Sequence, residues 1–310
     1  MGKEEAGERL DLFLAKRFTY LSRSSWKKHL SDGKISLDGK PCKASHILRE
    51  GEEVEYLPSD FPEPSVDTRF SLLYEEERFF AVTKSGDLPV HAAGRYRKNN
   101  LVDILESDGR FGRPYLVNRL DRETSGIVLF GKDSETASRL ASFFSTRSVH
   151  KIYISLVWGD FPKRLTASGW LGPDTESKIR KKRAFYDSAD PRIPQIPSED
   201  WETSSTDFRS LGGGFLDGKR FSRILCFPKT GRNHQIRATL YSLGFPLLGD
   251  KLYGVDETVF LDFIEGKQPN LMDRLGRERQ ALHAISLKFP HPYLKKRIDI
   301  FSPIPEDMLV

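Results

Sequence analysis

One short segment of this chain concentrates the residue types that acid–base or nucleophilic chemistry needs. Residues 117–126 read Val-Asn-Arg-Leu-Asp-Arg-Glu-Thr-Ser-Gly, and an apolar run follows at residues 127–130. A carboxylate such as Asp121, held in a fixed turn, could attack an electrophilic carbon or remove a proton. The same residue types are also ordinary turn formers in front of a strand. The segment therefore indicates a reactive carboxylate only if other parts of the sequence support it.

Two further segments offer partners for such a carboxylate. Residues 151–157 alternate in polarity, which predicts a strand with Lys151, Tyr153 and Ser155 on one face. Residues 230–237 read Thr-Gly-Arg-Asn-His-Gln-Ile-Arg and open a predicted helix. Each segment also has a plain structural interpretation, a half-buried edge strand in one case and a capped, polar helix start in the other. Neither pattern alone assigns a function.

Several common kinds of catalytic site are absent from the sequence. The histidines and cysteines form no His-Glu-x-x-His, no Cys-x-x-Cys and no paired metal-ligand spacing. The sequence has no Gly-x-x-x-x-Gly-Lys-Ser/Thr loop and no Gly-x-Ser-x-Gly elbow. A metalloenzyme, a P-loop ATPase and a serine hydrolase are therefore disfavoured. We expect chemistry on a carboxylate, without a metal or another cofactor.

The composition of the 310 residues limits the setting in which the protein works. Hydrophobic residues make up 38% and aromatic residues 11%, which is enough for a buried core. No run approaches the roughly 18 apolar residues that a membrane span needs, and the charged start does not resemble a secretory signal. The two cysteines, Cys42 and Cys226, cannot build a disulfide framework. We therefore expect a cytoplasmic protein with no membrane partner.

Residues 7–57 form a predicted small α/β module. Apolar residues within 10–14 predict one short helix, Ser22 or Ser24 can cap a second, and an Asp-Gly pair at 38–39 predicts a hairpin. The two predicted helices carry a cluster of cations, namely Lys16, Arg17, Arg23, Lys27 and Lys28. These cations could bind nucleic-acid phosphates, or they could simply form a solvated helix face.

The rest of the chain is predicted to be a second, larger domain. A proline-rich, acidic stretch at residues 58–69 is a predicted linker, and residues 70–310 follow it. A glycine-rich segment at residues 211–220 predicts the tip of a hairpin. The strand candidates, with helices between them, lie at residues 79–83, 127–130, 151–158 and 224–227.

Taken together, the three polar segments resemble those of the RluA family of RNA pseudouridine synthases. In that family a His-Arg-Leu-Asp-x-x-Thr-Ser-Gly loop, a lysine–x–tyrosine strand and a Gly-Arg-x-His-Gln-hydrophobic-Arg segment follow one another in this order. Residues 7–57 resemble the S4-like RNA-binding domain that many members carry. The resemblance covers most of the chain, and the motifs in this order are highly specific. Further matches lie at residues 73–76, 88–91, 246–254 and 282–292.

The resemblance implies a fold, a reaction and roles for particular residues. The fold would be α+β, with a mainly antiparallel mixed sheet and flanking helices beside the S4-like domain. The reaction would be isomerisation of uridine to pseudouridine in structured RNA. The resemblance gives the reactive carboxylate to Asp121, its basic partner to Arg237, and contact with the flipped uracil to Tyr153. Arg119 would occupy the space that the flipped base leaves, or order the displaced RNA strand.

The resemblance also bears on the RNA substrate. Because an S4-like domain is common in members that act on large-subunit (23S) ribosomal RNA, we expect rRNA more than tRNA. Residues 91–96 also resemble members that act on tRNA, so a tRNA substrate stays open. We expect a monomeric enzyme. Asn118 stands where the family usually has histidine, and asparagine can form hydrogen bonds but cannot titrate. The basic segment 178–183 falls where members often have a basic loop. Its predicted RNA contacts are Arg180, Lys181, Lys182 and Arg183.

Two other functions remain open at this point. A non-catalytic RNA-binding factor could keep the same fold and use the basic residues alone. Intact Asp121, Tyr153 and Arg237 argue against it, because binding of a phosphate-rich ligand does not need an acidic residue facing that ligand. A hydrolase could use Asp121 and Glu123 as a carboxylate pair, although two side chains at positions i and i+2 of a turn need not converge.

Overall fold

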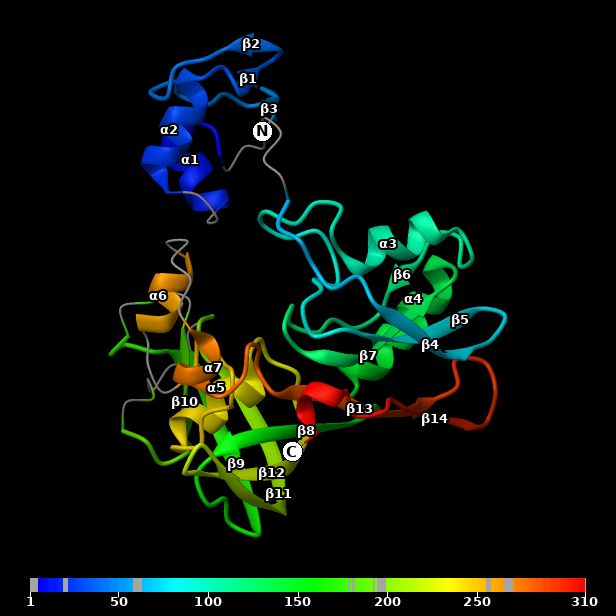
Figure 1. Ribbon diagram of the computed structural model, residues 1–310. Helices are drawn as coiled ribbons and strands as arrows, with labels where there is room; N and C mark the ends of the chain where they lie inside the picture. Colours follow the sequence, from blue (N-terminus) through cyan, green and yellow to red (C-terminus); the bar gives the residue numbers. More distant parts are fainter. Residues whose placement is uncertain are drawn as a thin grey trace. The chain divides into compact units, whose positions relative to one another are not determined.

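The structure is a computed structural model, in which the chain forms two compact units. One unit comprises residues 1–64 with 93–97, and the other comprises residues 65–92 with 98–310. Figure 1 labels the helices and strands of each. The residues that the structure describes are 5–18, 22–57, 63–177, 179, 182–191, 193, 199–254, 258–264 and 270–309.

The smaller unit packs two helices against a three-stranded sheet. The side chain of Ser22 accepts a hydrogen bond from the backbone N of Ser25 at 3.2 Å and so caps the second helix. The predicted hairpin turn at residues 38–39 joins the first two strands, and both of its residues have positive φ. The elements are α1 (Leu10–Arg17), α2 (Arg23–Ser31), β1 (Ile35–Leu37), β2 (Lys40–Pro41) and β3 (Val54–Tyr56), and the sheet order is β2-β1-β3.

The larger unit is built on an 11-stranded mixed sheet. Its main path runs β10-β9-β11-β12-β8-β13-β7-β5-β4, with β14 paired to β13 and β6 paired to β7. In the described part of the chain, β13 and β7 pair in parallel and the other neighbours are antiparallel. This confirms the predicted α+β fold. The strands are β4 (Phe70–Glu75), β5 (Phe79–Lys84), β6 (Tyr115–Leu116), β7 (Ser125–Gly131), β8 (His150–Trp158), β9 (Arg164–Pro173), β10 (Arg183–Asp187), β11 (Glu202–Leu216), β12 (Lys219–Pro228), β13 (Leu282–Pro290) and β14 (Arg297–Phe301).

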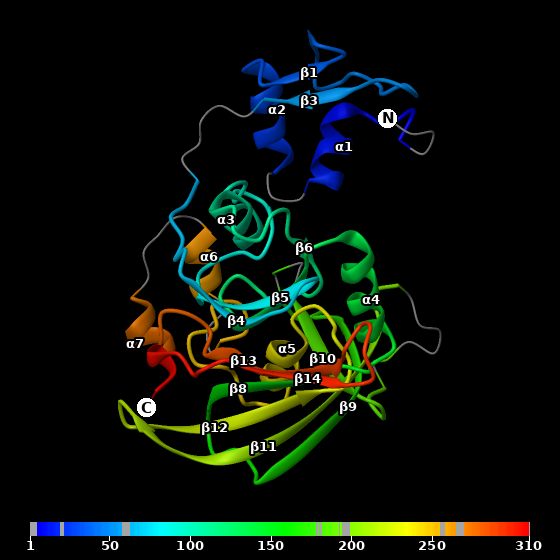
Figure 2. The same ribbon diagram turned by 90° about the vertical axis from the view of Figure 1, so that its right-hand side faces the viewer.

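Helices cover both faces of this sheet. Alternate residues of β5 and β7 face α3 on one side and α4 on the other, because successive side chains of a strand point in opposite directions. The apolar face of α5 packs on β9, β10 and β12. These elements can be followed in Figure 2. The helices are α3 (Leu101–Asp108), α4 (Ser134–Ser145), α5 (Gln235–Ser242), α6 (Thr258–Ile264), α7 (Leu271–Leu275) and the 3₁₀ turn η1 (Glu306–Met308).

The structure corrects one of the expected elements. Residues 230–234 are not helical, because His234 has a φ of 56° and α5 begins only at Gln235. The hairpin predicted at residues 211–220 is confirmed, because the turn that joins β11 to β12 falls at residues 217–218. The glycines at 212–214 lie in β11 itself, beside a bulge between Ser210 and Gly213. Among the described residues, no helix combines the length and the apolar character needed to cross a membrane.

Candidate active site

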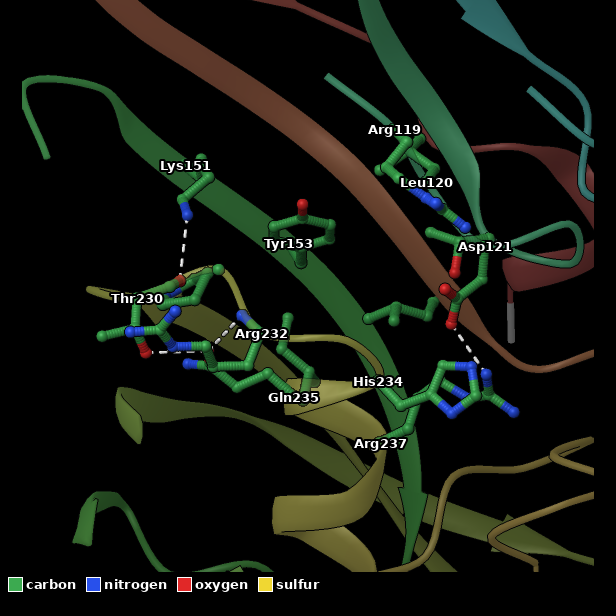
Figure 3. A pocket seen from close by; sticks show the side chains of 15 residues that line it. Arg119, Leu120, Asp121, Lys151, Tyr153, Thr230, Arg232, His234, Gln235 and Arg237 are labelled. Carbon is green, nitrogen blue, oxygen red and sulfur yellow. Dashed lines mark hydrogen bonds and ion pairs between the residues drawn. The ribbon is translucent and has the colours of Figure 1, made fainter. Parts of the chain in front are cut away.

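A pocket in the larger unit brings together all three polar segments that the sequence singled out. The loop before β7 contributes Asp121, β8 contributes Lys151 and Tyr153, and residues 230–237 form the opposite wall. Figure 3 shows these side chains converging on a shared space. Segments separated by more than 100 residues in the sequence thus line one site, as the resemblance implied.

Asp121 is the carboxylate of this pocket, and Arg237 is its cation. Arg237 Nη1 donates to Asp121 Oδ2 at 2.7 Å. Burial would raise the pKa of Asp121, but the charges of Arg237 and His234, with hydrogen bonds from Arg237 and Gln280, hold it below its ordinary value. Asp121 is therefore ionised at neutral pH.

A second carboxylate, Asp250, fixes Arg237 from the opposite side. Arg237 donates from Nε to Asp250 Oδ2 at 2.7 Å and from Nη2 to Oδ1 at 2.9 Å. Asp250 is fully buried and also accepts the backbone N–H groups of Leu252 and Tyr253 at 3.0 and 2.9 Å. Burial would lower the pKa of Arg237, yet the charge of Asp250 raises it. The guanidinium is thus held rigid and charged, with Nη1 directed at Asp121.

Tyr153 and Lys151 line the pocket from the same face of β8. Figure 3 shows the Tyr153 ring between Lys151 and the Asp121–Arg237 pair. Burial raises the pKa of Tyr153, and the charge of Asp121 adds to this shift, so the phenol keeps its proton at neutral pH. Lys151 Nζ donates to the backbone O of Thr230 at 3.0 Å, and burial lowers the pKa of Lys151 to about 8.

The loop that carries Asp121 is tied to its surroundings on both sides. Gln280 Nε2 donates to Thr124 Oγ1 at 2.6 Å, and Ser125 Oγ lies 2.9 Å from His283 Nδ1. Asn118 Oδ1 accepts the backbone N–H of Leu129 at 2.8 Å. Asn118, at the position where the family usually has histidine, thus orders the loop through the backbone of β7.

Glu123 belongs to a separate ion-pair group. Its Oε1 lies 2.8 Å from Lys251 Nζ and 2.6 Å from Arg122 Nη2. Glu123 does not line the pocket, so it does not form a carboxylate pair with Asp121. In the described part of the chain, no three His, Cys, Asp or Glu side chains gather as metal ligands.

The predicted RNA-binding residues of the larger unit lie in different environments. Arg119 is exposed and lines the pocket. Lys182 and Arg183 differ from the expectation of a free basic loop. The Lys182 side chain is 1% exposed, lies over the Tyr241 ring and pairs with a carboxylate, and Arg183 is half-buried and pairs with Glu202. Neither presents a surface charge for phosphate, and Arg180 and Lys181 lie outside the described residues.

The five cations predicted in the smaller unit are all exposed. Two of them, Arg23 and Lys27, surround a buried Asp11, and Lys16 Nζ lies 4.0 Å from a Glu8 oxygen. The sequence did not single out Asp11 or Arg9, which belongs to the same group. The exposed cations are Lys16, Arg17, Arg23, Lys27 and Lys28.

Comparisons with known proteins agree with this geometry. Residues 78–242 match the model of the RNA pseudouridylate synthase family, and residues 8–54 match that of the S4 domain. A ribosomal large subunit pseudouridine synthase D of Xanthomonas campestris is 30% identical over 98% of this chain and 87% of its own length. A mitochondrial tRNA pseudouridine(32) synthase of Saccharomyces cerevisiae is 26% identical over 88% of this chain and 57% of its own.

A solved structure is similar as well. Human RNA Pseudouridylate Synthase Domain Containing 1 superposes with a TM-score of 0.59 at 26% identity, covering 78% of this chain and 86% of that one. The order of the motifs, the pocket that they form and the family match all lead to one assignment. The chain belongs to the RNA pseudouridylate synthase family and has an S4 domain on the N-terminal side of its synthase domain.

Proposed function

We propose that this RNA pseudouridine synthase modifies specific uridines of large-subunit ribosomal RNA and that Asp121 is its reactive carboxylate. One observation carries the proposal. In a pocket with Tyr153 on its wall, Asp121 is paired with an arginine that is itself held by a buried carboxylate. A site that only bound RNA would gain nothing from a fixed negative charge facing a polyanion.

The chemistry of the reaction suits this set of side chains. Isomerisation breaks the glycosidic bond, turns the base and rejoins it through carbon, so no atom is gained or lost and no electron acceptor is required. Asp121, ionised beside Arg237, is placed to act on the sugar or the base of a bound uridine. Tyr153, which keeps its proton, offers an aromatic face for the uracil ring.

Arg119 has a different role in this proposal. A base inside an RNA helix must leave its stack before a carboxylate can reach the nucleotide. A guanidinium plane can stack on bases and bind phosphates, and Arg119 is exposed and lines the pocket. We infer that Arg119 contacts the RNA from which the uridine has been displaced.

The choice of ribosomal RNA is supported by the relatives that match nearly the whole chain. Relatives from Xanthomonas and Vibrio species are named ribosomal large subunit pseudouridine synthase D, and this chain covers 87% and 90% of their lengths. The yeast relative named for tRNA is covered over 57% of its length. The fuller coverage of the relatives that are named for ribosomal RNA favours rRNA as the substrate of this chain.

Mapping of pseudouridines in total RNA tests the proposal. A strain lacking the gene is compared with the same strain carrying the wild-type chain or the Asp121→Asn chain. We expect the deletion to remove one or a few pseudouridines of large-subunit rRNA, and we expect only the wild-type chain to restore them. If the deletion removed pseudouridines from tRNA alone, the proposed substrate would be wrong. Restoration by Asp121→Asn would contradict the role of Asp121.

A further inference from the structure

The smaller unit contains a fully buried carboxylate that is surrounded by three cations. The Asp11 side chain, in the first turn of α1, is 0% exposed. Its Oδ1 lies 3.0 Å from Arg9 Nε, and its Oδ2 lies 2.7 Å from Arg23 Nη2 and 3.7 Å from Lys27 Nζ. Arg9 is the N-cap of α1, while Arg23 and Lys27 are one turn apart on α2. The two helices therefore meet around this carboxylate.

The group carries more positive charge than burial of one carboxylate requires. A buried Asp needs a partner, because an unpaired buried charge is strongly destabilising. One arginine would meet that need, but three positive charges surround one negative charge here, which leaves a surplus of two. The three cationic side chains are 40%, 45% and 50% exposed, so this surplus faces the solvent.

Both arginines bind Asp11 through the same edge of the guanidinium. Arg9 donates from Nε and Nη2 at 3.0 and 3.4 Å, and Arg23 donates from Nε and Nη2 at 2.9 and 2.7 Å. A guanidinium has five N–H donors, and Nη1 carries two of them. Among the described residues, neither Nη1 group donates a hydrogen bond to another side chain or to the backbone. Each arginine is thus oriented by Asp11 while part of its donor set remains available to a ligand.

We propose that Asp11 is a positioning residue that holds Arg9, Arg23 and Lys27 as a preformed site for neighbouring phosphates of the substrate RNA. This inference rests on the proposed function in taking RNA as the ligand. Arginine donors in a fixed orientation match phosphate oxygens, and binding then costs less side-chain entropy than ordering three free side chains. The site includes Arg9, which the sequence pattern missed, and excludes Lys16, Arg17 and Lys28.

Substitution of Asp11 by asparagine separates this proposal from a simple count of charges. The full-length Asp11→Asn chain has one negative charge fewer, so charge alone predicts tighter RNA binding. The proposal predicts weaker binding, by roughly three- to tenfold, because one or two cations lose their orientation. The measurement is fluorescence anisotropy with a labelled, structured transcript of large-subunit rRNA. Asp32→Asn, at an exposed position of the same unit, is the control and should bind as the wild type or slightly more tightly.

Two further variants keep the test decisive if Asp11→Asn lowers the stability of the unit. Arg23→Gln and Lys27→Gln leave the Asp11–Arg9 pair in place, and each should reduce the salt dependence of log affinity by roughly 0.7–0.9 units per log unit of salt. Lys40→Gln, an exposed lysine on β2, should not change it. Circular dichroism and thermal melting establish that each variant is folded.

The outcomes distinguish this site from the proposed function. The inference is overturned if folded Asp11→Asn binds RNA as tightly as Asp32→Asn does. It is equally overturned if Arg23→Gln and Lys27→Gln bind with the salt dependence of Lys40→Gln. All variants should convert a short uridine-containing RNA at the wild-type rate when enzyme is saturating. If the wild type itself forms no pseudouridine, the proposed function fails, while the comparison of affinities still decides the phosphate site.

Discussion

At the scale of single residues, the site is a chain of three charged side chains that runs from the interior to the pocket. Asp250 is buried and has both oxygens engaged by Arg237 and by backbone N–H groups. Arg237 therefore has only Nη1 directed at Asp121. Because its charge is shared between two carboxylates, Arg237 keeps Asp121 ionised without enclosing it. Asp121 itself lines the pocket, and 26% of its side chain is exposed there.

Replacing Asp250 tests whether the orientation of Arg237 matters. In Asp250→Asn, an amide N–H group meets a guanidinium N–H group, so Arg237 cannot keep its position. We expect the turnover at saturating enzyme to fall about 10- to 100-fold with RNA affinity nearly unchanged, because Asp250 does not line the pocket. The free energy of unfolding should fall by about 3–5 kcal/mol. Asp299→Asn, which breaks the β14 ion pair with Lys288, is the control and should turn over as the wild type.

The pH dependence of turnover tests the electrostatic role of Arg237. Arg237 lowers the pKa of Asp121 from 3.8, so the wild type should show no acid limb from this group above about pH 5. In Arg237→Gln, burial remains and raises the pKa of Asp121. The fraction of ionised Asp121, and with it the single-turnover rate, should then rise with pH over the acidic range in which the wild-type rate is flat. A reduced but equally flat profile would show that Arg237 does not set the ionisation of Asp121.

The sequence identified some of these residues and missed others for a physical reason. Asp121 and Arg237 stand within motifs whose residue types and order are distinctive. Asp250 lies in a segment that the resemblance also covered, yet only the fold shows that it meets Arg237. Lys182 was wrongly expected at the surface, because a run of basic residues does not reveal that one of them is covered by the Tyr241 ring.

At the scale of elements, the parallel contact between β7 and β13 holds the Asp121 loop in place. Gly126 lies directly against the backbone of β13 at this contact. It has a φ of 113°, and a Cβ there would collide with the backbone O and N of Ala284 on β13. The loop that leads into β7 is therefore positioned by backbone contact, in addition to the hydrogen bonds that Thr124 and Ser125 form with Gln280 and His283.

Substitution of Gly126 should affect stability and activity together. We expect Gly126→Ala to lower the free energy of unfolding by about 2–4 kcal/mol and to reduce turnover severely, because β7 and β13 must separate. Gly244→Ala is the matched control, since Gly244 also has positive φ, at 82°, but open space around its Cβ position. Gly244→Ala should lower the free energy of unfolding by only about 1 kcal/mol, because of backbone strain. If chemical denaturation shows that Gly126→Ala and Gly244→Ala lose the same free energy of unfolding, the role given to the β7–β13 contact is refuted.

The strands were predictable where a segment alternated in polarity or formed a short apolar run. The strands expected at 127–130, 151–158 and 224–227 lie in β7, β8 and β12. Residues 230–234 were misassigned because a left-handed His234 delays the start of α5, and polar patterning cannot reveal a positive φ at a histidine. The Gln235 side chain instead accepts from Thr230 Oγ1 and Arg232 N at 2.7 and 2.9 Å and folds the segment on itself.

At the scale of the whole molecule, the proposed chemistry and part of the proposed RNA binding belong to different units. The described pocket residues all come from the larger unit, while the Asp11 group lies entirely in the S4 domain. The net charge of +5 is modest for a protein that binds RNA, so the location of the charges matters more than their sum. Loss of the S4 domain should therefore affect binding more than catalysis.

A shortened chain that begins at residue 65 tests this division. It should bind structured rRNA more weakly and with a shallower salt dependence, because phosphate contacts are lost. It should still convert a short RNA, since it retains Asp121, Tyr153 and Arg237. Undiminished affinity and salt dependence in a well-folded shortened chain would mean that the S4 domain does not contact the RNA.

The central claim is that Asp121 is the reactive carboxylate of an RNA pseudouridine synthase. The most direct measurement is the single-turnover rate of pseudouridine formation by Asp121→Asn at saturating enzyme, with RNA affinity and melting temperature measured on the same preparation. We expect the rate to fall by several orders of magnitude while affinity and melting temperature stay near those of the wild type. Substantial turnover by the purified, folded variant would contradict the claim.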